Sequence, residues 1–307
     1  MTSVRRRAFD ALIAILRKSL ERLVAYDVGR FTAPPTHSTN PPAVSRLLVT
    51  GAAGGVATLI RPYLRERYDT IILSDCVPIA DLAAHEVFIA ADLRDRGALD
   101  TAVAGVDAIL HLGAASLEAP FADLVGPNVV GVVNVLEAAR AAGVGRVVLA
   151  STMHVLGMYT RYEQVDVTSV ARPDSRYAVT KLFAEQMARV FAEKWNMRIA
   201  CIRIGHVMRE QLTADPGNWI SPRDLAALCF MAIEHPDIRF EIFHGVADYD
   251  GDDRGQPGTA RRFGYSAQDR GGSYADALSY MERYYEHDPT ARIYRGGSFA
   301  SSEWEPS

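Results

Sequence analysis

Residues 46–57 read RLLVTGAAGGVA, a short apolar run followed at once by a loop of small residues. Gly51 allows a tight turn, Gly54 lets the backbone approach a pyrophosphate, and Ala57 takes a position where only a small side chain lets a helix pack on the strand. The helix expected after the loop directs free N–H groups and a positive dipole end at phosphate. Glycine loops also occur in ordinary turns, but this one lies between a strand pattern and a helix pattern, as dinucleotide binding requires.

Strand and helix patterns alternate from this loop to residue 204. Short Val-, Ile- and Leu-rich strands that alternate with helices are typical of a buried parallel sheet with helices on both faces. The expected fold is therefore α/β, a Rossmann-type doubly wound parallel sheet with a small C-terminal substrate lobe. The expected strands are 46–50, 69–74, 86–90, 107–112, 145–151 and 197–204, and the expected helices run from the loop to about 66 and over 95–103, 120–142 and 175–196.

The chain divides into three predicted parts. Residues 1–45 carry apolar residues at helical spacing, basic residues mostly off that stripe, and the sequence PPTHSTNPP, so they form an N-terminal helical extension and linker. A transit peptide or a membrane-surface helix is the alternative for this extension. Residues 46–204 are the dinucleotide-binding Rossmann domain. Residues 205–307 form a C-terminal substrate-binding lobe, with helices near 222–234 and 274–285 and a strand near 240–244.

The composition narrows the class of protein. With 307 residues, 49% hydrophobic and 23% charged, the chain has the composition of a soluble globular protein. Its net charge of -4 argues against nucleic acid or an anionic membrane as the main partner, and no apolar run reaches the roughly 20 residues of a membrane span. Cys76, Cys201 and Cys229 stand alone, so we expect reduced core cysteines in a cytoplasmic protein. His154 and His206 lack an evident third ligand, so no metal site is expected.

Asp75 ends the second expected strand and decides between cofactors. A carboxylate there accepts hydrogen bonds from both ribose hydroxyls, whereas it would repel a 2′-phosphate. Cys76 and Val77 follow, where NADP sites usually place a basic residue, so the sequence predicts NAD. Asp92 and Leu93, after the third strand, are expected to cap the adenine. A turn aspartate at 75 and a helix N-cap at 92 are the alternatives.

Tyr177 and Lys181 are spaced by four in a helix pattern, which puts both side chains on one helical face. A buried ammonium beside a phenol stabilises the phenolate, so the pKa of the phenol is expected to fall toward neutrality. Such a tyrosine can take the proton of an alcohol while hydride leaves for a nicotinamide. Thr152, at the end of the preceding strand, offers a hydroxyl that orients the substrate oxygen. A surface pair on a helix is the alternative.

These features together resemble the extended, epimerase-like branch of the short-chain dehydrogenase/reductase superfamily, and within it the uronate dehydrogenases. The resemblance covers about residues 46–300. It rests on the motifs TGAAGGVA, HLGAAS (111–116), PNVVGVVNVLEAAR (127–140), LAST (149–152), ARPDSRYAVTKLFAE around the Tyr–Lys pair, CIRIG and YRGGSF (294–299).

The resemblance implies a homodimeric enzyme that oxidises C1 of a hexuronate with NAD and releases an aldonolactone. Thr152 is then the hydroxyl partner of the substrate, Tyr177 the base and Lys181 its modulator. Ser116 and His154 fall on pocket positions. The implied cofactor contacts are Gly51, Gly54, Gly55, Val56, Asp75, Asp92, Leu93, Leu112, Gly113, Ser151, Tyr177, Lys181 and Ile204.

Three substrate positions depart from the pattern of the resembling family. Met153 stands where the family has an asparagine that touches substrate, and His206 stands where it has a serine. The family places an arginine for the substrate carboxylate shortly before a tryptophan, but TADPGN precedes Trp219 here. Arg209 is the nearest arginine in that loop, only four residues after Gly205. The sequence therefore predicts a sugar or uronate, held by Ser116, Met153, His154, His206 and Arg209.

Two other functions remain open at this point. A sugar epimerase or dehydratase uses the same tyrosine and lysine but keeps its NAD bound, and it usually needs a larger C-terminal part than the one here. A non-catalytic NAD-binding sensor could share the fold, although such sensors tend to lose the tyrosine that this chain keeps.

Overall fold

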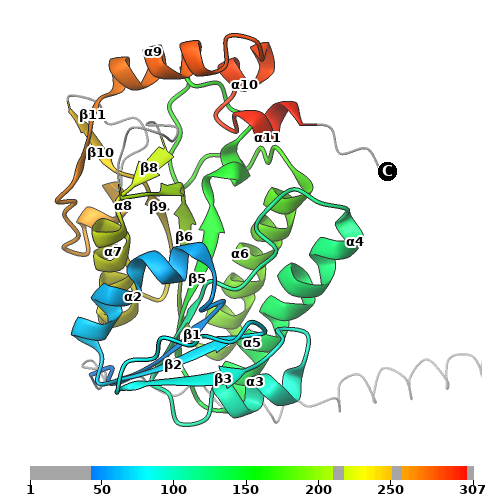
Figure 1. Cartoon of the computed structure of the whole chain (residues 1–307), viewed down its shortest axis with the longest axis vertical. Coiled ribbons are helices and arrows are strands. Elements are labelled where there is room, and N and C mark those ends of the chain that lie inside the picture. Colours follow the sequence, from blue (N-terminus) through cyan, green and yellow to red (C-terminus); the bar gives the residue numbers. More distant parts are fainter. Residues whose placement is uncertain (1–42, 210–217, 251–257, 303–307) are drawn as a thin grey trace, which may run out of the picture. The chain divides into compact units, whose positions relative to one another are not determined.

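The computed structural model describes residues 43–209, 218–250 and 258–302 (Figure 1). The helix predicted at the N-terminus lies outside these residues. Seven parallel strands form one sheet in the order β3-β2-β1-β4-β5-β6-β9. They are β1 (Arg46–Thr50), β2 (Thr70–Asp75), β3 (Glu86–Ala90), β4 (Ala108–His111), β5 (Arg146–Thr152), β6 (Arg198–Ile204) and β9 (Phe240–Gly245). The predicted Rossmann-type sheet is confirmed.

Alternate residues of the strands supply two separate cores, because successive side chains point to opposite faces. Leu47 and Val49 belong to one cluster and Leu48 to the other. Two helices cover the first face and three cover the second (Figure 1). The first pair is α2 (Gly55–Arg67) and α7 (Pro222–Glu234), and the others are α3 (Arg96–Ala102), α5 (Gly131–Ala141) and α6 (Arg176–Trp195).

The helix predicted over 120–142 has an unusual middle. Helix α4 (Phe121–Leu124) runs into α5 through six residues of π-helix, Val125–Val130. Pro127 lies in this segment and has no N–H to donate to an α-helical ladder, and single π turns of this kind occur often at functional sites. By length and composition Phe121–Ala141 could cross a membrane, but its inner face packs in the core of the sheet.

The expected division at residue 205 does not separate two bodies. Helix α7 packs beside α2, and β9 pairs with β6 as the seventh strand, so residues 222–245 belong to the sheet layer. The rest of the C-terminal part lies at the carboxyl ends of the strands (Figure 1). Its elements are β7 (His206–Val207), β8 (Trp219–Ile220), β10 (Asp248–Asp250), β11 (Arg270–Ser273), α8 (Gly258–Arg261), α9 (Tyr274–Tyr284), α10 (Pro289–Ile293) and α11 (Ser298–Ser301).

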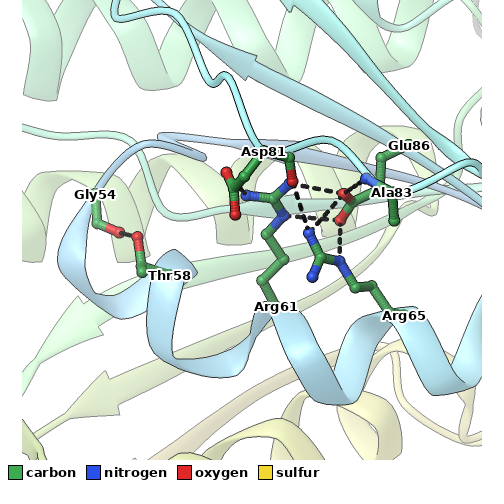
Figure 2. A network of polar contacts seen from close by, with 7 residues as sticks. All are labelled: Gly54, Thr58, Arg61, Arg65, Asp81, Ala83 and Glu86. Carbon is green, nitrogen blue, oxygen red and sulfur yellow. Dashed lines mark hydrogen bonds and ion pairs between the residues drawn. The ribbon is translucent and has the colours of Figure 1, made fainter.

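A buried ion network ties α2 to the segment between β2 and β3 (Figure 2). The guanidinium of Arg61 donates two hydrogen bonds to Glu86, at 2.6 and 2.7 Å, and two to Asp81, one to its carboxylate and one to its carbonyl. Arg65 adds two more to Glu86. Burial opposes ionisation of Glu86, but the hydrogen bonds from the two arginines outweigh it and hold its pKa well below the usual range. The network fixes the loop that begins at Asp75.

Candidate active site

A cleft of about 490 Å³ lies at the carboxyl edge of the sheet where the strand order reverses, between β1 and β4. Ligands of open α/β sheets bind at such a reversal. Nine of the predicted cofactor residues line this cleft: Gly51, Gly54, Gly55, Val56, Asp75, Asp92, Leu93, Leu112 and Gly113. Ser116, which we expected at the substrate, lines it as well.

Gly51 occupies a position that only glycine can fill. Its φ is 69°, and a Cβ there would come within 2.4 Å of the backbone of Gly113. The chain can therefore turn sharply at the end of β1 and begin helix α2 at Gly55, with Gly54 as the N-cap. Since no side chain caps that helix end, its N–H groups remain directed at the cleft.

The carboxylate of Asp75 connects the glycine loop to the segment that follows β2. One carboxylate oxygen accepts from the backbone N–H of Ala53 in the glycine loop, and the other accepts from that of Val77, each at 3.0 Å. Cys76 is exposed on the same rim, so the expectation that all three cysteines lie in the core is wrong for this one, while Cys201 and Cys229 are buried. The acidic rim carries no arginine or lysine directly after the strand.

Asp92 does not cap a helix. Its carboxylate accepts from the backbone N–H and the guanidinium of Arg94, and these hydrogen bonds lower the pKa of Asp92 to about 2. Asp95 is the N-cap of α3 instead, where it accepts from Ala98. Arg94 joins Asp92 and Leu93 in the lining of the cleft.

The predicted Thr152, Tyr177 and Lys181 come together at the ends of β5 and α6. Tyr177 is buried, and the hydroxyl of Thr152 lies close enough to it to act on the pKa of its phenol. Lys181 donates to the carbonyl of Ala150 at 2.9 Å, and its Nζ lies 5.9 Å from the centre of the tyrosine ring. The three side chains therefore form one polar cluster inside an apolar surround.

The expected fall in the pKa of the phenol is not found in this arrangement. Burial raises the pKa of Tyr177 to about 12, although the hydrogen bond with Thr152 acts in the opposite direction. Burial also lowers the pKa of Lys181 to about 8. The prediction considered only the attraction between the two groups, whereas desolvation disfavours the charged form of each.

A smaller cavity of about 90 Å³ lies beside this cluster. Its lining includes five predicted residues, namely Thr152, Met153, His154, Ile204 and His206, and also Phe299 from α11. A third cavity, of about 560 Å³, shares His206 with the small cavity and shares Gly55 and Val56 with the cofactor cleft. The 560 Å³ cavity therefore adjoins both the cofactor cleft and the small cavity, near the start of α2.

Two predicted site residues are not among those that line these cavities. The hydroxyl of Ser151 donates to the fully buried carboxylate of Glu185 at 2.6 Å, so its side chain is hydrogen-bonded within the protein interior. Arg209 is exposed and borders residues 210–217, which lie outside the described part of the chain. It does not appear among the described residues that line the small cavity.

Several residues at the site were missed by the sequence analysis. Asn128, in the π-helical segment, exchanges two hydrogen bonds with the backbone of Ala115 and donates to Thr180, between the tyrosine and the lysine. Glu118 accepts from the backbone N–H of Tyr177 at 2.9 Å. Asp174 pairs with His154 at 2.7 Å. A proline within a long helix pattern was the one available signal for the first of these.

Comparison with known proteins now adds to this geometry. The sequence matches the NAD dependent epimerase/dehydratase family over residues 47–216. This chain belongs to that family. A protein named uronate dehydrogenase, from Pseudomonas syringae pv. tomato, is 36% identical over 271 residues, which are 87% of this chain and 96% of the relative.

Two solved structures of this epimerase/dehydratase type resemble the chain along most of its length. A point mutant of uronate dehydrogenase from Agrobacterium tumefaciens, complexed with NAD, has a TM-score of 0.76 at 30% identity, and the match covers 85% of this chain and 98% of that one. A glucuronic acid dehydrogenase from Chromohalobacter salexigens has a TM-score of 0.75 at 32% identity, with the same shares. The predicted family and fold are confirmed.

Proposed function

We propose that this protein is an NAD-dependent dehydrogenase that oxidises C1 of a hexuronate or related sugar to the lactone. The observation that carries the proposal is the cluster of Thr152, Tyr177 and Lys181 at the ends of β5 and α6, with Thr152 in the wall of the small cavity, together with the dinucleotide cleft. The likeness to uronate and glucuronic acid dehydrogenases supports the choice of substrate class.

The residues divide the chemistry between them. NAD held by the glycine loop and Asp75 would supply the hydride acceptor, and its positive charge would favour the phenolate form of Tyr177. The C1 hydroxyl loses its proton to Tyr177 while the C1 hydrogen leaves as hydride, so the C1–O bond becomes the carbonyl of the lactone. Thr152 orients the reacting oxygen, and Lys181 supplies positive charge at the phenolate.

The substrate assignment is tested with wild-type protein and NAD, by following NADH formation with a hexuronate and with a neutral aldose. In our proposal Arg209 pairs with the substrate carboxylate, because bidentate arginine is the strongest protein partner of that group. Arg209→Ala should then raise the KM of the uronate about 100-fold and leave the aldose unaffected. Arg223→Ala, which removes an exposed arginine paired with Asp269, is the control. A wild type that prefers the aldose and ignores Arg209→Ala would overturn the uronate assignment.

Asp75 should make the enzyme prefer NAD over NADP by at least about tenfold, or roughly 1.4 kcal/mol, since a 2′-phosphate would face its carboxylate. Asp75→Ala should narrow that gap and also weaken NAD binding, because the carboxylate holds Ala53 and Val77. Ratios of kcat/KM for the two cofactors provide the measurement. Asp100→Asn changes an exposed carboxylate on α3, outside the cleft, and should leave the ratio unchanged. Equal use of NADP by the wild type would contradict this assignment.

We further propose a cytoplasmic homodimer, paired through its two long helices. Apolar side chains stand exposed on this surface, among them Phe121, Val130, Val179 and Val190. Pairing would remove them from water. A monomer mass from light scattering at micromolar concentration would contradict the pairing.

A further inference from the structure

His154 is held from three directions. Its Nδ1 lies 2.7 Å from a carboxylate oxygen of Asp174. Its ring stacks on Phe299, with centres 4.1 Å apart, and meets the ring of Tyr177 edge to face at 6.3 Å. The stacking on Phe299 and the contact with Asp174 together hold the ring in one orientation in the wall of the small cavity.

Asp174 lies in the loop before α6, but its carboxylate occupies a closely fitted interior position. Its side chain is fully buried, and it also accepts a hydrogen bond from Ser175, the N-cap of α6. Two glycines from distant segments leave the space that it fills. A Cβ on Gly157 would come within 1.8 Å of the carboxylate, and a Cβ on Gly296 within 2.0 Å.

An ionised carboxylate only accepts hydrogen bonds, so the Nδ1 that faces it must be the nitrogen that carries hydrogen. In the neutral ring this leaves Nε2 as a hydrogen-bond acceptor. A ring without the carboxylate would be free to adopt the other tautomer, in which Nε2 donates. The contact therefore decides what His154 offers to a ligand.

We propose that Asp174 is a positioning residue that fixes the orientation and tautomer of His154, so that Nε2 accepts a hydrogen bond from a hydroxyl of the bound sugar. The inference rests on the proposed function, because it takes the small cavity as the sugar site. It goes beyond that function in assigning a role to a residue that does not line the cavity.

The first test reads the tautomer directly and needs no turnover. Nitrogen-15 NMR of wild-type protein should show His154 as the Nδ1–H tautomer, with its signals assigned by their loss in His154→Asn. In Asp174→Asn the side-chain amide can donate to Nδ1, so the signals should move to the Nε2–H form. A wild-type ring in the Nε2–H form overturns the proposal, whether or not the variant folds.

The second test separates positioning from structural support. Asp174→Asn should raise the KM of a hexuronate about tenfold, with a smaller change in kcat and unchanged NAD affinity. In the His154→Asn background the same substitution should have no further effect. Asp166→Asn, an exposed carboxylate of the same loop, should match wild type. An unchanged KM, or an equal loss in both backgrounds, overturns the proposal. If wild type oxidises no uronate, the proposed function fails, and NMR still decides the role of Asp174.

Discussion

Tyr177→Phe should lower turnover by about three orders of magnitude or more, since general-base catalysis alone contributes roughly 100- to 10,000-fold. The phenyl ring keeps the packing against His154 and Phe299, and only the proton acceptor is lost. NAD affinity should therefore stay within about threefold of wild type, or roughly 0.6 kcal/mol, when it is measured by fluorescence titration.

The matched control for this substitution is Tyr159→Phe. Tyr159 lies in the loop after β5, and its hydroxyl donates to the carbonyl of Val170. Its removal should cost about 1 kcal/mol of stability and leave turnover close to wild type. Near-normal turnover in Tyr177→Phe would rule out Tyr177 as the base, because an enzyme that loses its general base must lose most of its turnover.

Glu185→Gln should lower the free energy of unfolding by about 3–5 kcal/mol, which is typical when one partner of a buried ion pair is removed. Glu185 is fully buried on α6 and accepts two hydrogen bonds at 2.9 Å from Arg203 on β6. It accepts a third from Ser151 on β5. The substitution leaves a guanidinium without its counter-charge in the interior, below the helix that carries Tyr177.

Denaturant unfolding of three further variants gives this prediction its controls. Glu193→Gln, on the same helix but in an exposed pair with Arg189, should change stability by less than about 0.5 kcal/mol. Glu185→Gln combined with Arg203→Met should be more stable than Glu185→Gln alone, because the uncompensated charge is gone. Arg203→Met alone should be as damaging as the first change. Wild-type stability in Glu185→Gln or in Arg203→Met alone would show that the buried ion pair contributes nothing to the free energy of unfolding.

The sheet could be predicted because its causes are local. Each strand from β1 to β6 is a short apolar run, and the glycine loop fixes the first crossover, so order and layers follow from alternation. Residues 240–245 also had a strand pattern, but periodicity does not say which edge a strand joins. The assignment of β9 to a separate lobe failed for that reason.

The site was predictable only where residues are close in sequence. The Tyr177–Lys181 spacing and the glycine loop are patterns within one element. Asp174 and Gly296 are far apart in the chain, and nothing in either segment indicates that they touch. The pKa of Tyr177 likewise depends on burial by groups from several elements, which a motif does not report.

The π-helical turn at Val125–Val130 gives the helix from Phe121 to Ala141 two different phases. A turn of this kind holds one residue more than an α turn, so the residues on either side are offset by about 100° of rotation. The segment around Asn128 can thus face α6 and donate to Thr180, while the part from Gly131 onward keeps its apolar stripe on the sheet. A deletion of one residue here would remove the extra residue of the π turn and bring the two surfaces into a single helical phase, so that they would compete. Length in this short segment is consequently as constrained as residue identity, and a natural variant with one residue fewer would need a compensating change in the helix that carries Tyr177.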